Sequence, residues 1–150
     1  MYRMGVLDQD GGLWSELTRR LPKAAGQPVR WTRQIGSESA RLDGLILAPS
    51  PGRLPAVFPA CRVLLIPGQL GCLAVQIPCV WAVSYGFSRR DTLTVSSLTD
   101  HGLEAALQRE ILTITGATIE RQELMLPAGP DPLTLLALTG AALLLGKSPC

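Results

Sequence analysis

The stretch CRVLLIP, residues 61–67, decides the fold class of this 150-residue chain. It is an apolar run without the alternation of a half-exposed strand, and GLILAP, residues 44–49, has the same character. Strands that are apolar on both faces are typical of a parallel sheet, because such a sheet is covered on both sides. The two stretches therefore predict an α/β fold built on a mostly parallel sheet.

The segments around these two runs predict the rest of a Rossmann-like sheet. Further strands are expected over residues 3–8, 28–35 and 79–86. Residues 11–24 repeat apolar side chains at helical spacing, and Pro22 and Gly26 end the expected helix. Residues 50–60 contain three prolines and predict a loop with a short helical turn, whereas GQLGCLAVQ, residues 68–76, fits either a short helix or another strand.

The second half of the chain predicts an antiparallel edge on this sheet. Residues 92–98 alternate, and residues 103–116 and 117–126 face each other across Thr115 and Gly116 as a hairpin. The start of this hairpin also has helical spacing. The strand is preferred because the following ILTITGATIE is rich in β-branched side chains.

DPLTLLALTGAALLLGK, residues 131–147, predicts a helix buried on nearly all sides. Asp131 caps its start, Pro132 suits its first turn, and Gly146 ends it. Its apolar part is about 14 residues, shorter than the roughly 20 that cross a bilayer, so no membrane partner is expected. The prediction is one α/β domain, Rossmann-like, with an antiparallel C-terminal hairpin edge and a buried C-terminal helix.

Composition and charge exclude several classes of protein. The apolar share of 47% is too high for a disordered chain, and the scattered charges, which sum to +2, give no nucleic-acid footprint. Cys61, Cys72, Cys79 and Cys150 lack metal-ligand spacing, so buried reduced thiols are expected, with neither a metal nor a cofactor. MYRMGVLDQD at the start reaches acidic residues too early for a signal peptide, which predicts a cytoplasmic location.

Two stretches of the second half carry a resemblance to a known family. VSYGFSRRDTLTVSSL, residues 83–98, and LMLPAGPDPLTLLALTGAALLLG, residues 124–146, resemble the latter part of the central domain of Mur ligases. In that family a strand ends near a Tyr-Gly or Phe-Gly turn, antiparallel strands follow, and a Leu- and Ala-rich helix comes last. The resemblance covers about residues 80–146 and implies an α/β layout with an antiparallel edge.

The chain departs from this family at the positions that bind ATP. The first expected strand leads into Asp8 rather than into a phosphate loop, and Pro127, Ala128, Gly129 and Pro130 lack the family's Asn. Gly146-Lys147-Ser148 ends a helix, whereas a phosphate loop must begin one. The resemblance therefore implies the layout without ligase activity.

VLDQDGGL, residues 6–13, resembles the opening motif of haloacid dehalogenase-like phosphatases. By that resemblance Asp8 is a nucleophile, Asp10 is a general acid and base, and Ser50 stands where the family has its Ser or Thr. Gly12 replaces the family's Thr, and no later pair of acids follows a strand. The alternative is that Asp10 caps the helix while Asp8 ends the strand.

Two other loops and one histidine are weaker candidates. Gly68 and Gly71 follow an expected strand, where backbone N–H groups can hold an anion, although a plain turn is the preferred interpretation. Arg89 and Arg90 follow another strand and suit a carboxylate or phosphate clamp, unless they are a solvated loop. His101 is expected in an exposed turn without a catalytic role.

These loops share one property: each follows a strand that is expected to be parallel, so they lie on one edge of the sheet, where open α/β sheets bind ligands. The candidate ligand-binding residues are Asp8, Asp10, Gly11, Gly12, Ser50, Gly68, Gly71, Ser88, Arg89 and Arg90. The shortage of convergent polar groups favours a non-catalytic interaction or assembly protein, or a degenerate enzyme-like domain. The apolar C-terminal helix and ribbon are the expected homodimer face. The alternative is a small enzyme or sensor that binds an anionic, phosphorylated ligand at this edge.

Overall fold

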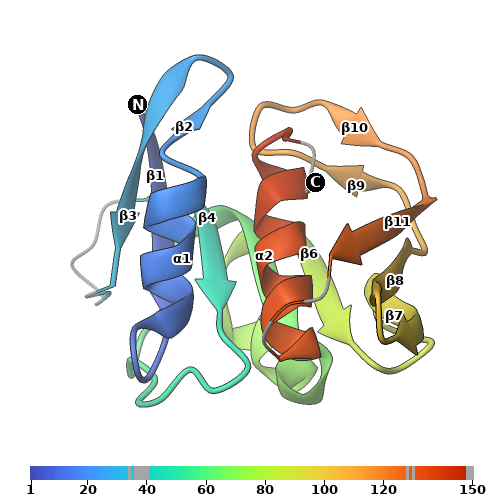
Figure 1. Ribbon diagram of the computed structural model, residues 1–150. Coiled ribbons are helices and arrows are strands. Elements are labelled where there is room, and N and C mark those ends of the chain that lie inside the picture. The colour runs from blue at the N-terminus through green and yellow to red at the C-terminus, as the bar shows by residue number, and fades with distance from the viewer. Residues whose placement is uncertain (34, 36–40, 128, 130, 148–150) are drawn as a thin grey trace.

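A nine-stranded sheet forms the centre of the protein (Figure 1), in the order β11-β8-β7-β6-β5-β4-β1-β3-β2. The computed structural model describes residues 1–33, 35, 41–127, 129 and 131–147. The strands of the parallel half are β1 (Tyr2–Leu7), β3 (Gln27–Thr32), β4 (Leu42–Leu47), β5 (Cys61–Pro67) and β6 (Cys79–Gly86). The remaining strands of the sheet are β2 (Lys23–Ala24), β7 (Leu93–Thr99), β8 (Gly102–Leu107) and β11 (Gln122–Pro127).

The pairing of these strands confirms the mixed α/β prediction. β3, β1, β4, β5 and β6 are mutually parallel, and β7 is parallel to β6 at two positions. β7, β8 and β11 are antiparallel to their neighbours, so the antiparallel edge follows the parallel half as expected. The two-residue β2 was not predicted, because it is short and pairs only with β3.

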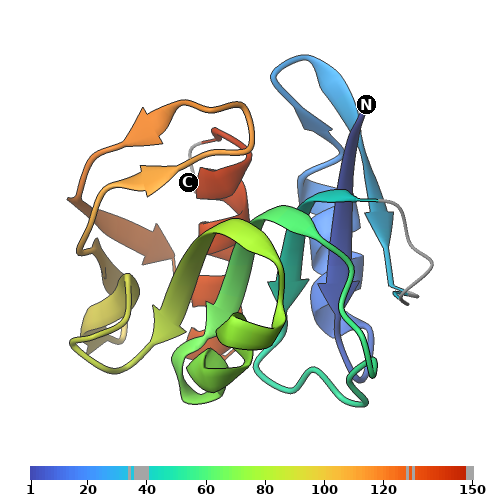
Figure 2. The same ribbon diagram turned by 180° about the vertical axis from the view of Figure 1, so that it is seen from behind.

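The two faces of the sheet are covered differently. α1 (Gly12–Arg20) and α2 (Pro132–Leu144) lie side by side on one face (Figure 1). On the opposite face (Figure 2), residues 50–60 and the 3-10 helix η1 (Gly68–Gln76) cover the parallel strands, with Phe58 packed into that core. Residues 68–76, for which the sequence left helix and strand open, therefore form a helix.

The C-terminal ribbon is the predicted hairpin, interrupted once. β8 pairs with β11 in the nine-stranded sheet, while β9 (Ile111–Leu112) and β10 (Thr118–Ile119) form a separate two-stranded sheet at the tip. Gly116 turns the tip with a φ of +90°, which a glycine adopts without strain. The helical alternative for the start of this ribbon is wrong. His101 lies in the β7–β8 turn, as expected.

α2 is built as its sequence predicts. The Asp131 carboxylate accepts a hydrogen bond from the Thr134 amide at 3.2 Å, and Gly146 follows the end of the helix with a φ of +74°. Residues 135–144 are all buried, because the helix packs on β5, β6, β7 and α1. The helix thus uses these side chains for packing within the chain, whereas the homodimer face expected of helix and ribbon stays a prediction. Over the described residues, no helix combines the length and the apolar character needed to cross a bilayer.

The cysteines differ in burial more than their apolar sequence surroundings predict. Cys61 is buried and Cys79 is half-buried, but Cys72 is exposed on η1, so the expectation of burial is wrong for Cys72. All three are free thiols. Burial raises the pKa of the Cys61 thiol to about 12. Positions 128, 130, 148 and 150, discussed above, lie outside the described residues.

Candidate functional site

The order of the parallel strands sets where a ligand site is expected. From β1 the chain continues to β3 on one side of β1, and then to β4 on its other side. The connections that leave β1 and β4 therefore diverge at their carboxyl ends, and such a divergence opens a crevice in α/β sheets. A hollow of about 500 Å³, here called the switch-point hollow, lies there and is lined by Leu7, Asp8, Gln9, Arg33, Pro51, Gly52 and Arg53.

Arg33 is held in a defined position at this hollow. Its Nη2 donates a hydrogen bond to the backbone oxygen of Asp8 at 3.0 Å, and its guanidinium lies 5.9 Å from the centroid of the Trp14 ring. Gly11 passes close by with a φ of +80°, and a Cβ there would lie 2.9 Å from Nη1. The glycine therefore leaves the space that the guanidinium occupies.

The walls of the switch-point hollow are tied to each other. The Gln9 amide donates to the Ser50 oxygen at 3.1 Å, and the Ala48 amide donates to the Leu7 oxygen at 2.9 Å. Gly52, with a φ of +77°, packs against Gln9, and a Cβ on it would lie 3.1 Å from the Gln9 Cβ. These contacts fix the loop after β4 against the loop after β1.

Asp8 and Asp10 bind the first turn of α1. The Asp10 Oδ1 accepts from the Gly12 amide at 2.8 Å, and the Asp8 Oδ2 accepts from the Trp14 amide at 3.0 Å. The N-cap residue is Gly11 rather than Asp10, which corrects the expected cap by one position. The strand-to-helix turn was thus predicted correctly, but both carboxylates contribute to it.

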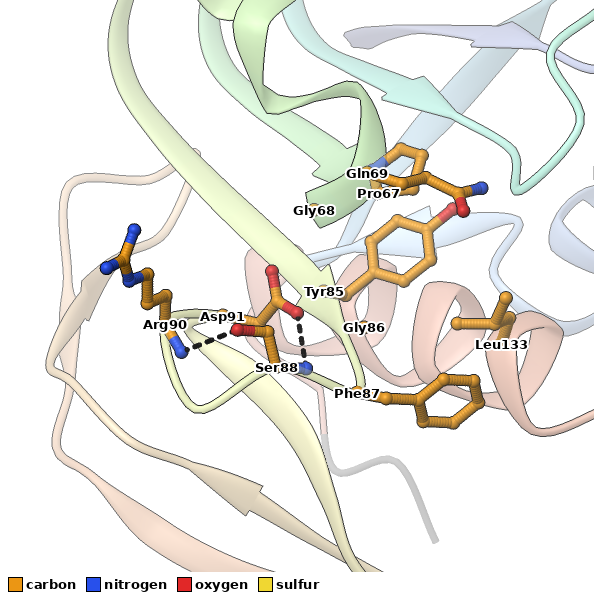
Figure 3. A pocket seen from close by; sticks show the side chains of 10 residues that line it. All are labelled: Pro67, Gly68, Gln69, Tyr85, Gly86, Phe87, Ser88, Arg90, Asp91 and Leu133. Carbon is orange, nitrogen blue, oxygen red and sulfur yellow. Dashed lines mark hydrogen bonds between the residues drawn. The ribbon is translucent and has the colours of Figure 1, made fainter.

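A second hollow, of about 420 Å³, lies beyond the carboxyl ends of β5 and β6 (Figure 3). Its lining residues are Pro67, Gly68, Gln69, Tyr85, Gly86, Phe87, Ser88, Arg90, Asp91 and Leu133. Tyr85 is fully buried, and its hydroxyl donates to the Leu47 oxygen of β4 at 2.7 Å. Burial raises the pKa of Tyr85, and the negative charges of Asp8 and Asp131 raise it further.

Asp91 braces this second hollow. Only 5% of the residue is exposed, and its Oδ2 accepts from the Ser88 amide at 3.0 Å (Figure 3). The carboxylate fills the space beside two glycines: a Cβ on Gly86 would lie 2.6 Å from Oδ2, and one on Gly68 would lie 2.8 Å from Cγ. Gly68 is therefore required by packing against Asp91.

The predicted ligand residues divide between the two hollows. Asp8 lines the switch-point hollow, whereas Gly68, Ser88 and Arg90 line the second one. The other predicted residues flank these loops without lining either hollow: Asp10, Gly11, Gly12, Ser50, Gly71 and Arg89. Sequence reasoning missed Arg33 and Arg53. The strand-end rule was available for Arg33, which directly follows β3, but Arg53 lies in an irregular loop without any such signal.

A different feature is the outer edge of β6. Beyond Tyr85 and Gly86, which pair with β7, no described strand pairs with this edge at residues 79–84. The Cys61 amide donates to the Pro78 oxygen, so even-numbered residues point their backbone groups at β5. The N–H and C=O groups of Cys79, Trp81 and Val83 consequently point outward. Val83 is only 1% exposed, however, so its groups are covered within the chain and only those of Cys79 and Trp81 are open.

No protein-family model matches the chain, and no curated protein matches it. Within the described part of the chain, no group of three His, Cys, Asp or Glu side chains is arranged to hold a metal ion.

Proposed function

We propose that the protein is a non-catalytic assembly module with a Rossmann-like layout, which pairs with a second copy through the open edge of β6. The single observation that carries this proposal is the open backbone edge at residues 79–82, where Cys79 and Trp81 point their N–H and C=O groups outward. The resemblance to Mur ligases suits a degenerate enzyme-like domain that keeps the layout and lacks the ATP-binding residues. A cytoplasmic location, in keeping with three free cysteines, belongs to the same proposal.

The side chains of this edge favour a partner. Val80 is 63% exposed and Trp81 is 42% exposed, and residues 79–84 carry no charge. Natural sheets protect open edges with charged residues, prolines, bulges or a covering segment, because an open apolar edge pairs with other chains. Residues 79–82 carry no charge, proline or bulge, whereas Val83 is already covered within the chain. A strand from another molecule is therefore the expected cover of residues 79–82.

The spacing of the outward groups favours a second copy as the partner. Cys79 and Trp81 lie symmetrically on either side of Val80 along the strand. An antiparallel copy with Val80 opposite Val80 brings Cys79 opposite Trp81 at both ends. Each of these two residue pairs exchanges two hydrogen bonds, about four in all. Such a contact is isologous and closes as a dimer rather than as a fibre.

A non-catalytic role is supported by what the strand-end carboxylates contact. Asp8 and Asp10 accept from amides of α1, and Asp91 accepts from Ser88. Each is thereby used in holding a loop. A nucleophile or general base needs in addition a partner group that tunes it for proton transfer. Among the described residues, none of these three carboxylates has a histidine or lysine partner.

The test is the molar mass in solution, measured by light scattering over a range of protein concentrations. The dimer mass is expected at high concentration, together with slow hydrogen exchange of the Cys79 and Trp81 amides. Trp81→Pro removes an outward N–H without removing a bond to β5, and is expected to yield a monomer. Trp81→Ala is the matched control, because it keeps the N–H and should still dimerise, though more weakly.

Two results would contradict the proposal. One is a monomer mass at every concentration with fast exchange at Trp81. The other is a dimer whose mass is unchanged in Trp81→Pro, which would place the contact elsewhere.

A further inference from the structure

We infer that the switch-point hollow binds the phosphate group of a small hydroxylated molecule, with Arg33 and Arg53 as the groups that hold the phosphate. This site lies at the carboxyl ends of β1 and β4, whereas the proposed assembly edge lies along the amino-terminal part of β6. The inference is therefore independent of the assembly role.

The guanidinium groups of the hollow are available to a ligand. Among the described residues, neither Arg33 nor Arg53 has a carboxylate within 4.0 Å, whereas Arg19 and Arg20 both pair with Glu16 at 2.7 Å. Arginine presents its donors in a planar fork that suits phosphate. Two such groups facing one hollow without an ion pair predict an anionic ligand.

The acids nearby do not cancel this charge. The carboxylates of Asp8 and Asp10 are turned to the amides of Trp14 and Gly12. The first turn of a helix carries partial positive charge, which offsets both carboxylates. They also occupy those amides, so the ligand is expected to meet arginine side chains rather than the helix terminus.

The hollow is prepared for binding before a ligand arrives. Arg33 is already fixed by the Asp8 oxygen and the Trp14 ring, so little side-chain freedom is lost when it binds. Gly52 packed on Gln9 fixes the opposite wall. Donors that are already held in place favour phosphate binding, because less side-chain entropy is lost when the ligand binds.

The size and the lining of the hollow define the rest of the ligand. About 500 Å³ is within the range of sites for small molecules and exceeds what a lone phosphate fills. Asp8 and Gln9 line the same hollow, and both side chains carry oxygens that accept hydrogen bonds. The body attached to the phosphate is therefore expected to carry hydroxyl groups rather than a hydrocarbon chain.

The experiment is isothermal titration of the full chain with glycerol 3-phosphate, with inorganic phosphate, and with succinate. The ester is expected to bind more tightly than inorganic phosphate, and succinate more weakly than both. Arg33→Gln and Arg53→Gln should each raise the Kd for the ester at least about tenfold. Arg30→Gln is the matched control: it removes the same charge from β3, on an exposed residue outside the hollow, and should leave the Kd within about twofold.

Several outcomes overturn the inference. Equal losses in Arg30→Gln and Arg33→Gln mean that net charge, and not the hollow, attracts the anion. Equal affinity for the ester and for inorganic phosphate means that the hydroxylated part of the ester makes no contact with the hollow. Tighter binding of succinate makes the hollow a carboxylate site. No heat with any of the three ligands, from a chain with the circular dichroism spectrum of a folded α/β protein, rejects the site.

Discussion

The loops after β1 and after β6 lie on the same edge of the sheet and use an aspartate in opposite ways. Asp10 in the first loop is exposed and binds only amides of α1. Asp91 in the second loop is buried between Gly68 and Gly86 of two different segments. The first loop can therefore change with little effect on the sheet, whereas the second is fixed by the strands themselves.

The second loop also determines the open edge of β6. Residues 87–92 connect β6 to β7 directly, although parallel neighbours usually need a connection of a dozen or more residues. The short loop limits their pairing to Tyr85 and Gly86. Asp91 fixes its turn, and the Gln108 side chain donates to the Asp91 oxygen at 2.6 Å. β7 thus runs beyond β6, and residues 79–82 are left without a neighbour.

The largest expected effect is on the second loop. Gly86→Ala places a methyl group 2.6 Å from the Asp91 Oδ2. We expect a loss of about 2 kcal/mol in the free energy of unfolding, because the buried carboxylate has no room to move aside. Urea denaturation followed by circular dichroism measures this loss.

The control for this effect is a double-mutant cycle. Asp91→Ala removes the group that the new methyl meets, so the two losses should fall short of additivity by at least about 1 kcal/mol. Additive losses would show that Gly86→Ala destabilises the protein through the backbone at position 86 and not through a clash with Asp91.

Tyr85 links β6 to the end of β4, and Tyr85→Phe has the next largest expected effect. It removes the buried hydrogen bond to the Leu47 oxygen, which costs about 1 kcal/mol at neutral pH. Burial raises the pKa of Tyr85 in the folded protein above the value of about 10 for an exposed phenol. Its contribution is therefore complete below pH 10 and is lost as the pH rises above about 10, where the unfolded chain gives up the proton.

The measurement is the thermal midpoint of both proteins from pH 8 to about pH 11, a range that spans the phenol pKa. The stability of the wild-type protein should decline more steeply at the alkaline end than that of Tyr85→Phe. Parallel declines would mean that Tyr85 is not what couples the fold to alkaline pH.

A smaller effect is expected in the first loop. Asp8→Ala leaves the half-buried Trp14 amide without its acceptor, and a loss of about 1 kcal/mol is expected from the range for helix caps. Asp10→Ala removes an exposed bond to Gly12, so about half of that loss is expected. Asp131→Ala, at the start of α2, is the reference for a single cap. Unchanged stability in Asp8→Ala would show that the Asp8 carboxylate does not stabilise the first turn of α1.

The layout of the fold was predictable because it depends on local patterns. Apolar runs without alternation gave β4 and β5, the sequence around Gly116 gave the hairpin, and Asp131 with Pro132 gave the start of α2. The cap of α1 was misplaced because Asp10 and Gly11 both suit that position. Only the φ of +80° at Gly11 separates them.

The candidate site was less predictable, because its parts are distant in sequence. Arg33 reaches the hollow only because β3 lies beside β1, and Arg53 only because Gly52 turns its loop against Gln9. The burial of Asp91 depends on two glycines, one of them 23 positions earlier in the chain, Gly68. Strand composition likewise does not reveal which edge of β6 is open, since that depends on where β7 begins.

The smallest expected effect separates binding from stability at the switch-point hollow. Arg53→Gln should change the free energy of unfolding by less than about 0.5 kcal/mol, because the residue is exposed. Arg33→Gln loses the bond to the Asp8 oxygen and the contact with Trp14, so about 1 kcal/mol is expected. If both variants lose ester binding to a similar degree while only Arg33→Gln loses stability, the arginines act on the ligand directly. A stability loss in Arg53→Gln as large as that of Gly86→Ala would make the switch-point hollow as structural as the loop after β6, and the contrast between these two regions would fail.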